Sequence, residues 1–349
     1  MMNEPSFNHP TAVVAGWYWA CRAAELPRGR VRAQQVLGRE LAIYRGVEGR
    51  AVALDAYCAH MGAHLAEGRV EGNALRCFFH RWRYEADGRC SDVPCLDGVP
   101  PLRARVRSWP TAEKHGLIWV WTGTAAPHGV PEPAGLVGSD YVCHVANSFE
   151  KGCHPNVVMI NAIDEQHFRS VHRLPGEILR MESTARSESN IEFNNTGHVP
   201  RRHWFGRQLG RFYSGPLTYA LSYWYGSTGF VTFGPDRLQL HLMFALRRSE
   251  NGKTIGQAVT FTRKRRGVFG LLASFVLLRL TALAARYFAL GDTRIFNTIR
   301  FRLSTPIPAD RAVMAFIEHL ERQPLAEWSE PTVATPFPVR LRVAPRERT

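Results

Sequence analysis

Short β-like runs broken by turn residues fill the chain from residue 16 to about residue 122. The clearest runs are 31–36, 40–45, 51–55 and 116–121, with turn signals at 48–49, 87–88 and 97–98. This spacing of hydrophobic and polar positions predicts a compact all-β domain. A stretch at 125–138 that contains Pro and Gly is expected to connect it to the rest of the chain.

The pattern changes after this connection. Residues 161–172 read as a helix that carries His and Asp, and strand-like alternation runs from about 189 to 262. An apolar stretch at 268–290 and a helix near 310–323 follow. A curved antiparallel sheet flanked by helices accounts for this half, so we expect an α+β protein with domains at 1–125 and 126–349.

Composition narrows the class of protein. The 349 residues are 45% hydrophobic and 21% charged, which suits a globular core, and the net charge is +14. That charge suits nucleic acid, an anionic membrane or an acidic protein, but no nucleic-acid motif is present, so no nucleic-acid partner is expected. The first ten residues lack signal-peptide features, and seven Cys is an odd number, so a reducing cytoplasmic setting is predicted.

Two short segments each pair a Cys with a His. Cys58 and His60 are followed, after sixteen intervening residues, by Cys77 and His80. Such a Cys2His2 set can bind zinc or a [2Fe–2S] cluster in which two His replace two Cys on one iron. Zinc fingers usually pair Cys with Cys, so one Cys and one His in each loop favours the cluster over zinc or two unrelated pairs.

The run CAHMGAHLAEGRVEG…LRCFFHRWRYEADGRC resembles the Rieske domain of ring-hydroxylating and related oxygenases. The flanking GWYWA and Trp82 fit the same pattern. Respiratory Rieske proteins carry two further Cys, where this chain has Ala63 and Phe79. The resemblance therefore favours the oxygenase branch, with Cys58, His60, Cys77 and His80 as cluster ligands.

A second constellation, N-x2-D-x2-H-x4-H, runs from Asn161 to His172. On a helix, Asp164 and His167 share a face, whereas His172 requires the helix to end or widen after His167. Two His and one carboxylate on one side of an iron form the facial triad of non-haem oxygenases. This segment resembles the iron-site helix of the same family. The resemblance implies iron ligation by His167 and His172, a bridging role for Asp164 toward a neighbouring subunit's cluster, and an outer role for Asn161.

The third ligand must be a downstream carboxylate. Asp236 lies in a turn, Asp310 precedes a helix as an N-cap, and the default for Glu318 is a solvated helix face. Asp292 directly follows the apolar stretch, and its placement resembles the carboxylate ligand of the family. We therefore expect Asp292 to complete the site.

The resemblance implies a helix-grip (START-like) second domain and the activity of a terminal oxygenase with a [2Fe–2S] cluster, mononuclear Fe(II) and O2. Since no G-x-G-x-x-G follows a strand, NAD(P)H is expected to act only through a separate reductase, with or without a ferredoxin. A head-to-tail homotrimer is also implied. A basic face among Arg76, Arg81, Arg83 and Arg89 is either a docking site for an acidic donor or a solvated surface.

The apolar stretch 268–290 follows Arg263-Lys264-Arg265-Arg266 and contains Arg279 and Arg286. Three interpretations of this stretch stay open. It could be a membrane span, although the two arginines would be costly there, or an amphipathic helix at the site entrance that touches the membrane surface. It could also be an ordinary buried helix.

Aromatic residues upstream of this stretch suit an apolar pocket: Trp204, Phe205, Phe212, Tyr223, Trp224 and Phe230. The pattern resembles the monooxygenase-like branch of steroid 9α-hydroxylases and cholesterol desaturases. This resemblance implies a hydrophobic, sterol-like substrate in steroid or lipid metabolism. The reaction would be hydroxylation, demethylation, desaturation or oxidative cyclisation. The competing functions are a Rieske electron carrier or redox sensor without oxygenase activity, and a zinc-stabilised lipid-binding protein.

Overall fold

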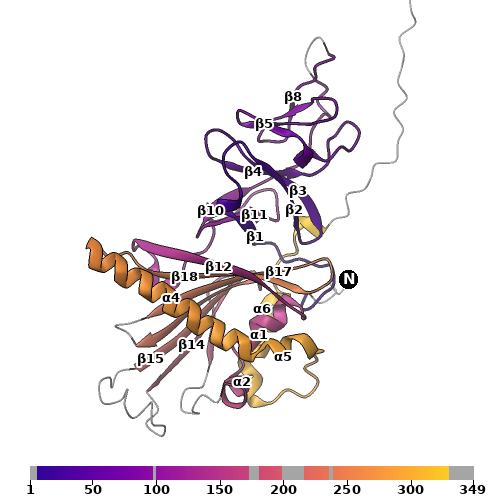
Figure 1. Cartoon of the computed structure of the whole chain (residues 1–349). Helices are drawn as coiled ribbons and strands as arrows, with labels where there is room; N and C mark the ends of the chain where they lie inside the picture. The colour runs from indigo at the N-terminus through magenta and orange to yellow at the C-terminus, as the bar shows by residue number, and fades with distance from the viewer. Residues whose placement is uncertain (1–5, 97–99, 173–180, 199–215, 236–238, 330–349) are drawn as a thin grey trace, which may run out of the picture.

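The structure is a computed structural model of the whole chain, and it describes residues 6–96, 100–172, 181–198, 216–235 and 239–329. Small sheets gather at one end of the molecule, and one large sheet with its helices occupies the other (Figure 1). The predicted turn at 97–98 and the candidate Asp236 lie outside the described residues.

Three antiparallel sheets form the first part of the chain. The expected runs at 31–36, 40–45, 51–55 and 116–121 are all strands. One sheet has the order β2-β3-β4-β9, a second β5-β6-β7-β8 and a third β1-β11-β10. The strands are β1 (Trp17–Arg22), β2 (Val31–Val36), β3 (Arg39–Arg45), β4 (Ala51–Asp55), β5 (Arg69–Glu71), β6 (Ala74–Arg76), β7 (Arg83–Tyr84), β8 (Cys90–Asp92), β9 (Ser108–Trp109), β10 (Thr111–Lys114) and β11 (Leu117–Trp121).

A seven-stranded antiparallel sheet dominates the second part, in the order β12-β18-β17-β16-β15-β14-β13. The expected alternation at 189–262 corresponds to β14–β18. Strand β12, which continues the expected connection and pairs with β18, was missed by the sequence analysis. The strands are β12 (Tyr141–Lys151), β13 (Glu182–Ala185), β14 (Asn190–His198), β15 (Pro216–Trp224), β16 (Thr228–Pro235), β17 (Leu240–Arg248) and β18 (Thr254–Arg263).

The prediction of one continuous helix over 161–172 is wrong. Helix α1 (Pro155–Asn161) ends at Asn161, and α2 (Glu165–Ser170) begins after Asp164, whose side chain caps it. An N-cap carboxylate satisfies backbone N–H groups that have no partner inside the helix, so Asp164 starts a new helix instead of lying on one. The required end between His167 and His172 is present, because α2 stops at Ser170.

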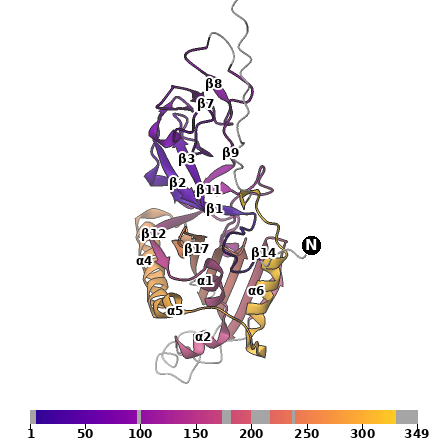
Figure 2. The ribbon, with the colours of Figure 1, turned by 90° about the vertical axis from the view of Figure 1, so that its right-hand side faces the viewer.

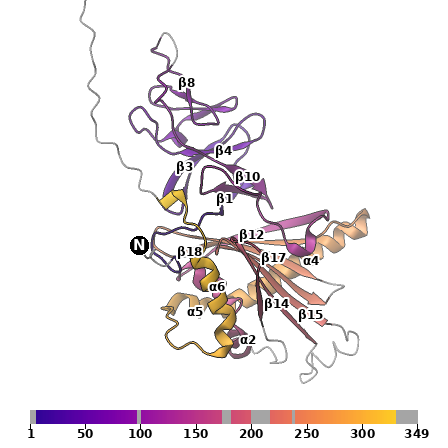
Figure 3. The same cartoon turned by 180° about the vertical axis from the view of Figure 1, so that it is seen from behind.

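Three further helices follow the large sheet: α4 (Gly267–Gly291), α5 (Thr293–Thr298) and α6 (Arg311–Glu321). Helix α4 packs against β12, β17 and β18 at one end of the sheet, and α6 packs against β13 and β14 at the other (Figures 2 and 3). Only 17% of the most apolar window of α4 is buried. The ordinary buried helix is therefore wrong, because most large side chains of α4 face outward.

The two parts share one hydrophobic core. Trp19 and Trp119 of the β1-β11-β10 sheet belong to the same buried cluster as Met243 and Phe261 of the large sheet. The chain also returns to the first part after α6, where the Trp328 ring packs 4.5 Å from Trp109. This shared packing fixes how the first part sits on the large sheet.

Candidate metal centres

Two tight loops present the Cys/His pairs. The first follows β4 and is closed by hydrogen bonds from Cys58 N to Ala63 O and from Gly62 N to Cys58 O, both 2.9 Å. The second joins β6 to β7 and is closed by a 2.9 Å bond from Cys77 N to Trp82 O. Each loop therefore needs one residue with positive φ, supplied by Gly62 at 74° and by Arg81 at 64°.

The loops bring the four predicted cluster ligands together. Cys58 and Cys77 are buried, whereas His60 and His80 are exposed at the tip, with ring centroids 4.6 Å apart. The sulfur side thus faces the protein and the imidazole side faces outward. A cluster whose two irons take two Cys and two His matches this division.

Two neighbours support these loops. The Tyr84 hydroxyl lies 3.0 Å from Cys58 Sγ and accepts a hydrogen bond from Ala59 N at 3.1 Å. The Trp82 ring stacks on His60 with 4.6 Å between centroids. Trp82 was expected only as part of the motif, and Tyr84 was not predicted. Its position directly after Arg83 on a short strand beside the second Cys/His loop was the available signal.

Zinc fits these four residues poorly. Ligands of one tetrahedral zinc lie within about 4 Å of each other, given bonds of about 2.0–2.3 Å. Among the described residues, the only group of three or more His, Cys, Asp or Glu ligand atoms within 4.8 Å of one another is elsewhere, at His167, His172 and Asp292. The Cys/His set is therefore more open than one zinc ion requires, and a two-iron cluster fits it better.

The second constellation converges with Asp292, which caps the C-terminal end of α4. Its Oδ1 atom lies 3.0 Å from His167 Nε2 and 3.1 Å from His172 Nε2, and the two Nε2 atoms are 3.0 Å apart. Helix α2 and the bend after it supply the histidines, while α4 supplies the carboxylate from 120 residues beyond His172. The structure thus brings together the three residues expected to bind iron.

These distances allow a test of whether a metal fits. Three ligands about 2.1 Å from an ion are about 3.0 Å apart on an octahedral face and about 3.4 Å apart in a tetrahedron. The observed separations match the octahedral face. In addition, Asp292 Oδ1 is buried and makes no hydrogen bond among the described residues, which a cation would compensate. Two His, one carboxylate and open positions suit non-haem Fe(II).

Asn161 closes one side of the triad. Its amide nitrogen donates to Asp292 Oδ2 at 2.9 Å and lies 3.1 Å from His167 Nε2. Burial lowers the pKa of His172, partly offset by Asp292, which favours the neutral imidazole that a metal requires. Asn161 therefore contacts two of the three residues expected to bind iron.

Two residues near the triad were missed. Lys151 Nζ donates to the Oγ1 of Thr293, the residue that follows Asp292, at 2.9 Å. Burial lowers the pKa of the Lys151 ammonium group. Tyr219 Oη donates to Ala162 O at 2.9 Å, and burial raises the pKa of its hydroxyl. Both lie on strands of the large sheet, so only the tertiary fold connects them with the motif.

Asp164 lies at the start of α2. Its Oδ1 accepts hydrogen bonds from Gln166 N at 2.9 Å and His167 N at 3.2 Å, while the residue stays partly exposed. One carboxylate oxygen thus fixes the backbone of His167. Its Oδ2 has no hydrogen-bond partner among the described residues.

The other carboxylate candidates do not approach the triad. Asp310 accepts hydrogen bonds from Ile307 N and from the Gln166 side chain, and Glu318 is an exposed partner of Arg322 at 3.6 Å. Of the expected pocket aromatics, Trp204, Phe205 and Phe212 lie outside the described residues. Tyr223 and Phe230 belong to the buried core, with Trp224 packed against it, so these three do not define a pocket.

Residues 16–110 match the family model of the Rieske [2Fe-2S] domain. The first part of the chain is a Rieske domain. The match implies a [2Fe–2S] centre in this domain.

The chain is 37% identical over 169 residues to a probable 3-ketosteroid-9-alpha-monooxygenase oxygenase component of Rhodococcus rhodochrous, covering 47% of this chain and 42% of that protein. It is 36% identical over 180 residues to the aminopyrrolnitrin oxygenase PrnD of Pseudomonas fluorescens, covering 49% of each. The chain thus spans less than half the length of these relatives. The crystal structure of dicamba monooxygenase bound to dicamba shares the fold, with a TM-score of 0.66 and 21% identity over 89% of this chain and 98% of that one.

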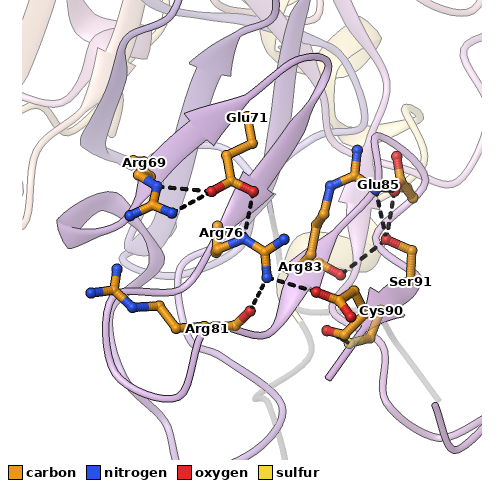
Figure 4. Close-up of polar contacts among 9 residues, drawn as sticks. Arg69, Glu71, Arg76, Arg81, Arg83, Glu85, Cys90 and Ser91 are labelled. Carbon is orange, nitrogen blue, oxygen red and sulfur yellow. Dashed lines mark hydrogen bonds and ion pairs between the residues drawn. The ribbon is translucent and has the colours of Figure 1, made fainter. Parts of the chain in front are cut away.

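The basic face of the Rieske domain is largely neutralised within the domain itself (Figure 4). Arg76 pairs with Glu71 and, at 2.8 Å, with Asp92, and Arg83 pairs with Glu85 at 2.6 Å. Arg76 also donates to the Arg81 carbonyl, which steadies the loop that carries His80. Of the expected four arginines, Arg81 is exposed without an acidic partner among the described residues, and Arg89 lies 4.0 Å from Asp87.

Proposed function

We propose that this chain is the terminal oxygenase component of a multicomponent Rieske system, in which externally supplied electrons and O2 oxidise a hydrophobic substrate. The observation that carries the proposal is the convergence of His167, His172 and Asp292 within about 3 Å of one another in a chain with a Rieske domain. An electron carrier or redox sensor has no use for a second, buried ligand set. The division into domains at 1–125 and 126–349 belongs to this proposal.

The two geometries support the proposed ligand assignment. Cys58, His60, Cys77 and His80 hold the [2Fe–2S] cluster, and His167, His172 and Asp292 hold Fe(II). A mononuclear iron with open positions supplies O2 activation when bound. The chain's own residues orient it, because the Asn161 amide nitrogen donates to Asp292 Oδ2 and Asp164 fixes the backbone of His167.

A head-to-tail homotrimer accounts for the distance between the two ligand sets. The β5-to-β8 end, with its exposed His60 and His80, and helix α2 lie at opposite ends of the molecule in all three views (Figures 1–3). Electrons would then pass from the cluster of one subunit to the iron of the next. Asp164 is the proposed bridge, since it is partly exposed and already bonded to the His167 backbone.

The electron donor is a separate reductase, with or without a ferredoxin, and it links the chain to NAD(P)H. The tip of the Rieske domain suits a protein contact, because exposed Phe78, Phe79 and Met61 surround the exposed histidines. Arg81 would favour an acidic partner at this tip.

The substrate is proposed to be sterol-like or another lipophilic polycycle. The relatives support this class unevenly, since one is named for a ketosteroid and the other for aminopyrrolnitrin. The reaction is a hydroxylation, demethylation, desaturation or oxidative cyclisation in steroid or lipid metabolism. We place the protein in the cytoplasm, in peripheral contact with the inner face of the membrane.

A substrate screen with a compatible reductase tests the function. Steroids and smaller aromatic compounds are incubated with the chain, reductase, NAD(P)H and O2, and products are read by mass, with ¹⁸O2 to follow oxygen incorporation. The proposal expects a product that depends on both O2 and the reductase. The chain would instead be an electron carrier if the reductase reduces its cluster but no substrate is converted and no O2 is consumed through the iron site.

A further inference from the structure

Helix α4 has its polarity reversed relative to an ordinary surface helix. Its buried positions include Ser274 and Thr281, with Leu278 between them. Its outward positions are large and apolar, and Phe269 is 88% exposed. Surface helices of soluble proteins place the apolar stripe against the core and the polar residues outside. The outer face of α4 is therefore built to contact something else.

The exposed apolar side chains form a continuous outer face along most of α4, which runs across the front of the large sheet in Figure 1. These residues, here called the outer face, are Val268, Phe269, Leu271, Leu272, Phe275, Val276, Leu280, Leu283, Tyr287 and Leu290. Several are spaced three or four apart, so they line up on one side of the helix. A contiguous apolar surface of this length marks an interaction site.

The charge around this outer face has one sign. Residues 251–309 contain ten Lys or Arg, whereas Asp292 is their only acidic residue and is turned into the metal triad. The basic run Arg263-Lys264-Arg265-Arg266 stands directly before the helix, and exposed Arg279 and Arg286 flank its outer face. This span carries most of the net charge of +14. Apolar side chains flanked by cations match a surface that is apolar inside and anionic at its boundary.

The helix is long and apolar enough to cross a membrane by composition. Its packing indicates a different orientation. Thr260 of β18 donates to the Leu278 carbonyl at 3.3 Å, and the Ser274 side is covered by the sheet. With one side attached along the sheet, α4 can offer a membrane only its outer face. The geometry therefore fits a helix lying in the plane of the interface.

We propose that the outer face of α4 docks this protein on an anionic phospholipid bilayer, with the basic run 263–266 at the headgroups. Helix α4 ends at Gly291, directly before the metal-site residue Asp292, and its Phe288 ring packs 5.0 Å from His172. Docking would thus place the metal triad close to the bilayer. If the proposed function holds, a lipophilic substrate would pass from the membrane to the iron without crossing water.

A second copy packed symmetrically through its own α4 fits this face less well, and a head-to-tail contact through α4 is tested by the sedimentation experiment below. Two α4 helices packed against each other would bring the basic runs and Arg279 and Arg286 into one contact, with no acidic residue between 251 and 291 to offset them. Like charges at such close range oppose association. An anionic bilayer supplies the missing opposite charge, at about fivefold in affinity for each Lys or Arg near its surface.

Vesicle sedimentation of the full chain, loaded with its metals, tests the docking. We expect binding to vesicles of phosphatidylcholine mixed two to one with phosphatidylglycerol, weaker binding to phosphatidylcholine alone, and loss at high salt. Leu272→Glu/Leu283→Glu should lower the affinity at least about tenfold, because two outward apolar side chains become anionic. Lys264→Glu/Arg266→Glu should lower it by at least about 25-fold, from two sites at about fivefold each.

Matched controls carry the same chemical changes elsewhere. Leu102→Glu alters a 96% exposed leucine of the Rieske domain, and Arg30→Glu/Arg50→Glu reverses two exposed charges there. Both controls should bind vesicles nearly as the unaltered chain does. Failure of the unaltered chain to bind mixed vesicles, or equal losses in the controls, would overturn the docking.

Two further readouts separate this inference from its alternatives. If Leu272→Glu/Leu283→Glu reduces the oligomer size in sedimentation velocity, the outer face is a subunit contact and the membrane proposal is wrong. Turnover of a detergent-dispersed substrate and the visible spectrum report the proposed function separately. Vesicle binding without turnover would refute only the oxygenase, and turnover without vesicle binding would refute only the docking.

Discussion

The two candidate metal regions differ in exposure and in how far apart along the chain their ligands lie. The proposed cluster ligands come from two short loops and present His60 and His80 to solvent. The iron triad is buried or nearly so, and its carboxylate is supplied from a distant helix end. An exposed imidazole edge suits the passage of electrons between proteins, whereas a buried triad with open positions suits chemistry kept away from water. This difference supports two metal sites with separate roles in one chain, one for electron transfer and one for the oxidation chemistry.

The largest expected effect comes from the buried triad. His167→Ala should reduce turnover to the background of the assay and remove the mononuclear iron, while the cluster spectrum stays unchanged, since the two ligand sets share no residue. Iron content and visible absorption check both halves of the prediction. His144→Ala, which removes a histidine on β12 outside both sets, serves as the control. Loss of the cluster spectrum with normal turnover would reverse our assignment.

Asp164 is proposed to link the exposed cluster edge of one subunit to the iron of the next subunit. Asp164→Asn should slow turnover by about 100-fold, the upper range for outer partners of a metal site, with both metals retained. Asn caps a helix as well as Asp does, so stability should not change. Asp164→Ala should lose the cap as well, at about 1 kcal/mol of unfolding free energy. Normal single-turnover oxidation of the cluster in the Asn variant would remove the bridging role.

Acid should destabilise the fold through two buried histidines that pack beside the large sheet. Burial lowers the pKa of His154, which caps α1, and of His115, which packs on Phe261, to about 4 in both cases. Because the unfolded chain binds these protons at about pH 6.5, their stabilising contribution is complete above that pH and is lost as pH falls toward 4. Each should cost about 1–3 kcal/mol, measured by urea unfolding at several pH values.

A conservative variant isolates one of these histidines. In the folded protein, Asn156 N donates a hydrogen bond to His154 Nδ1 at 3.2 Å. His154→Asn keeps a side-chain acceptor for this bond but removes the imidazole that titrates. The dependence of stability on pH between 6.5 and 4 should become shallower in this variant. An unchanged slope would show that His154 is not held neutral in the folded protein.

The smallest expected effect concerns the cluster alone. Tyr84→Phe removes the hydroxyl beside Cys58 Sγ and should lower the reduction potential, on the order of tens of millivolts, because hydrogen bonds to the sulfurs stabilise the reduced cluster. Tyr44→Phe is the matched control, since its hydroxyl donates to Asn73 O and touches no cluster ligand. Equal shifts in both variants would assign the effect to general packing.

Local motifs were enough to predict the cluster loops and most strands. Cys58, His60, Cys77 and His80 lie close together in sequence, so their spacing already contained the site. The boundaries of 31–36 and 51–55 agreed with β2 and β4 because turn residues bracket both runs. Asp292 could be chosen only by resemblance, because the contact between α4 and α2 is a property of the tertiary fold.

Other features depended on interactions that residue patterns do not contain. Propensity allowed one helix over 161–172, but the capping bonds of Asp164 divided it. Tyr84 and Lys151 act through neighbours that the fold supplies. The sequence left the exposed docking helix at 268–290 as one of three interpretations, because a buried helix and an exposed docking helix have the same apolar composition.

Metal analysis of the anaerobically purified chain, combined with its visible spectrum, decides whether the chain holds both a cluster and a mononuclear iron. We expect a reducible [2Fe–2S] spectrum, with two irons and two inorganic sulfides for the cluster and one further iron that disappears in His167→Ala. Zinc in place of iron, or an iron-to-sulfide ratio of one that His167→Ala leaves unchanged, would contradict the two-metal oxygenase.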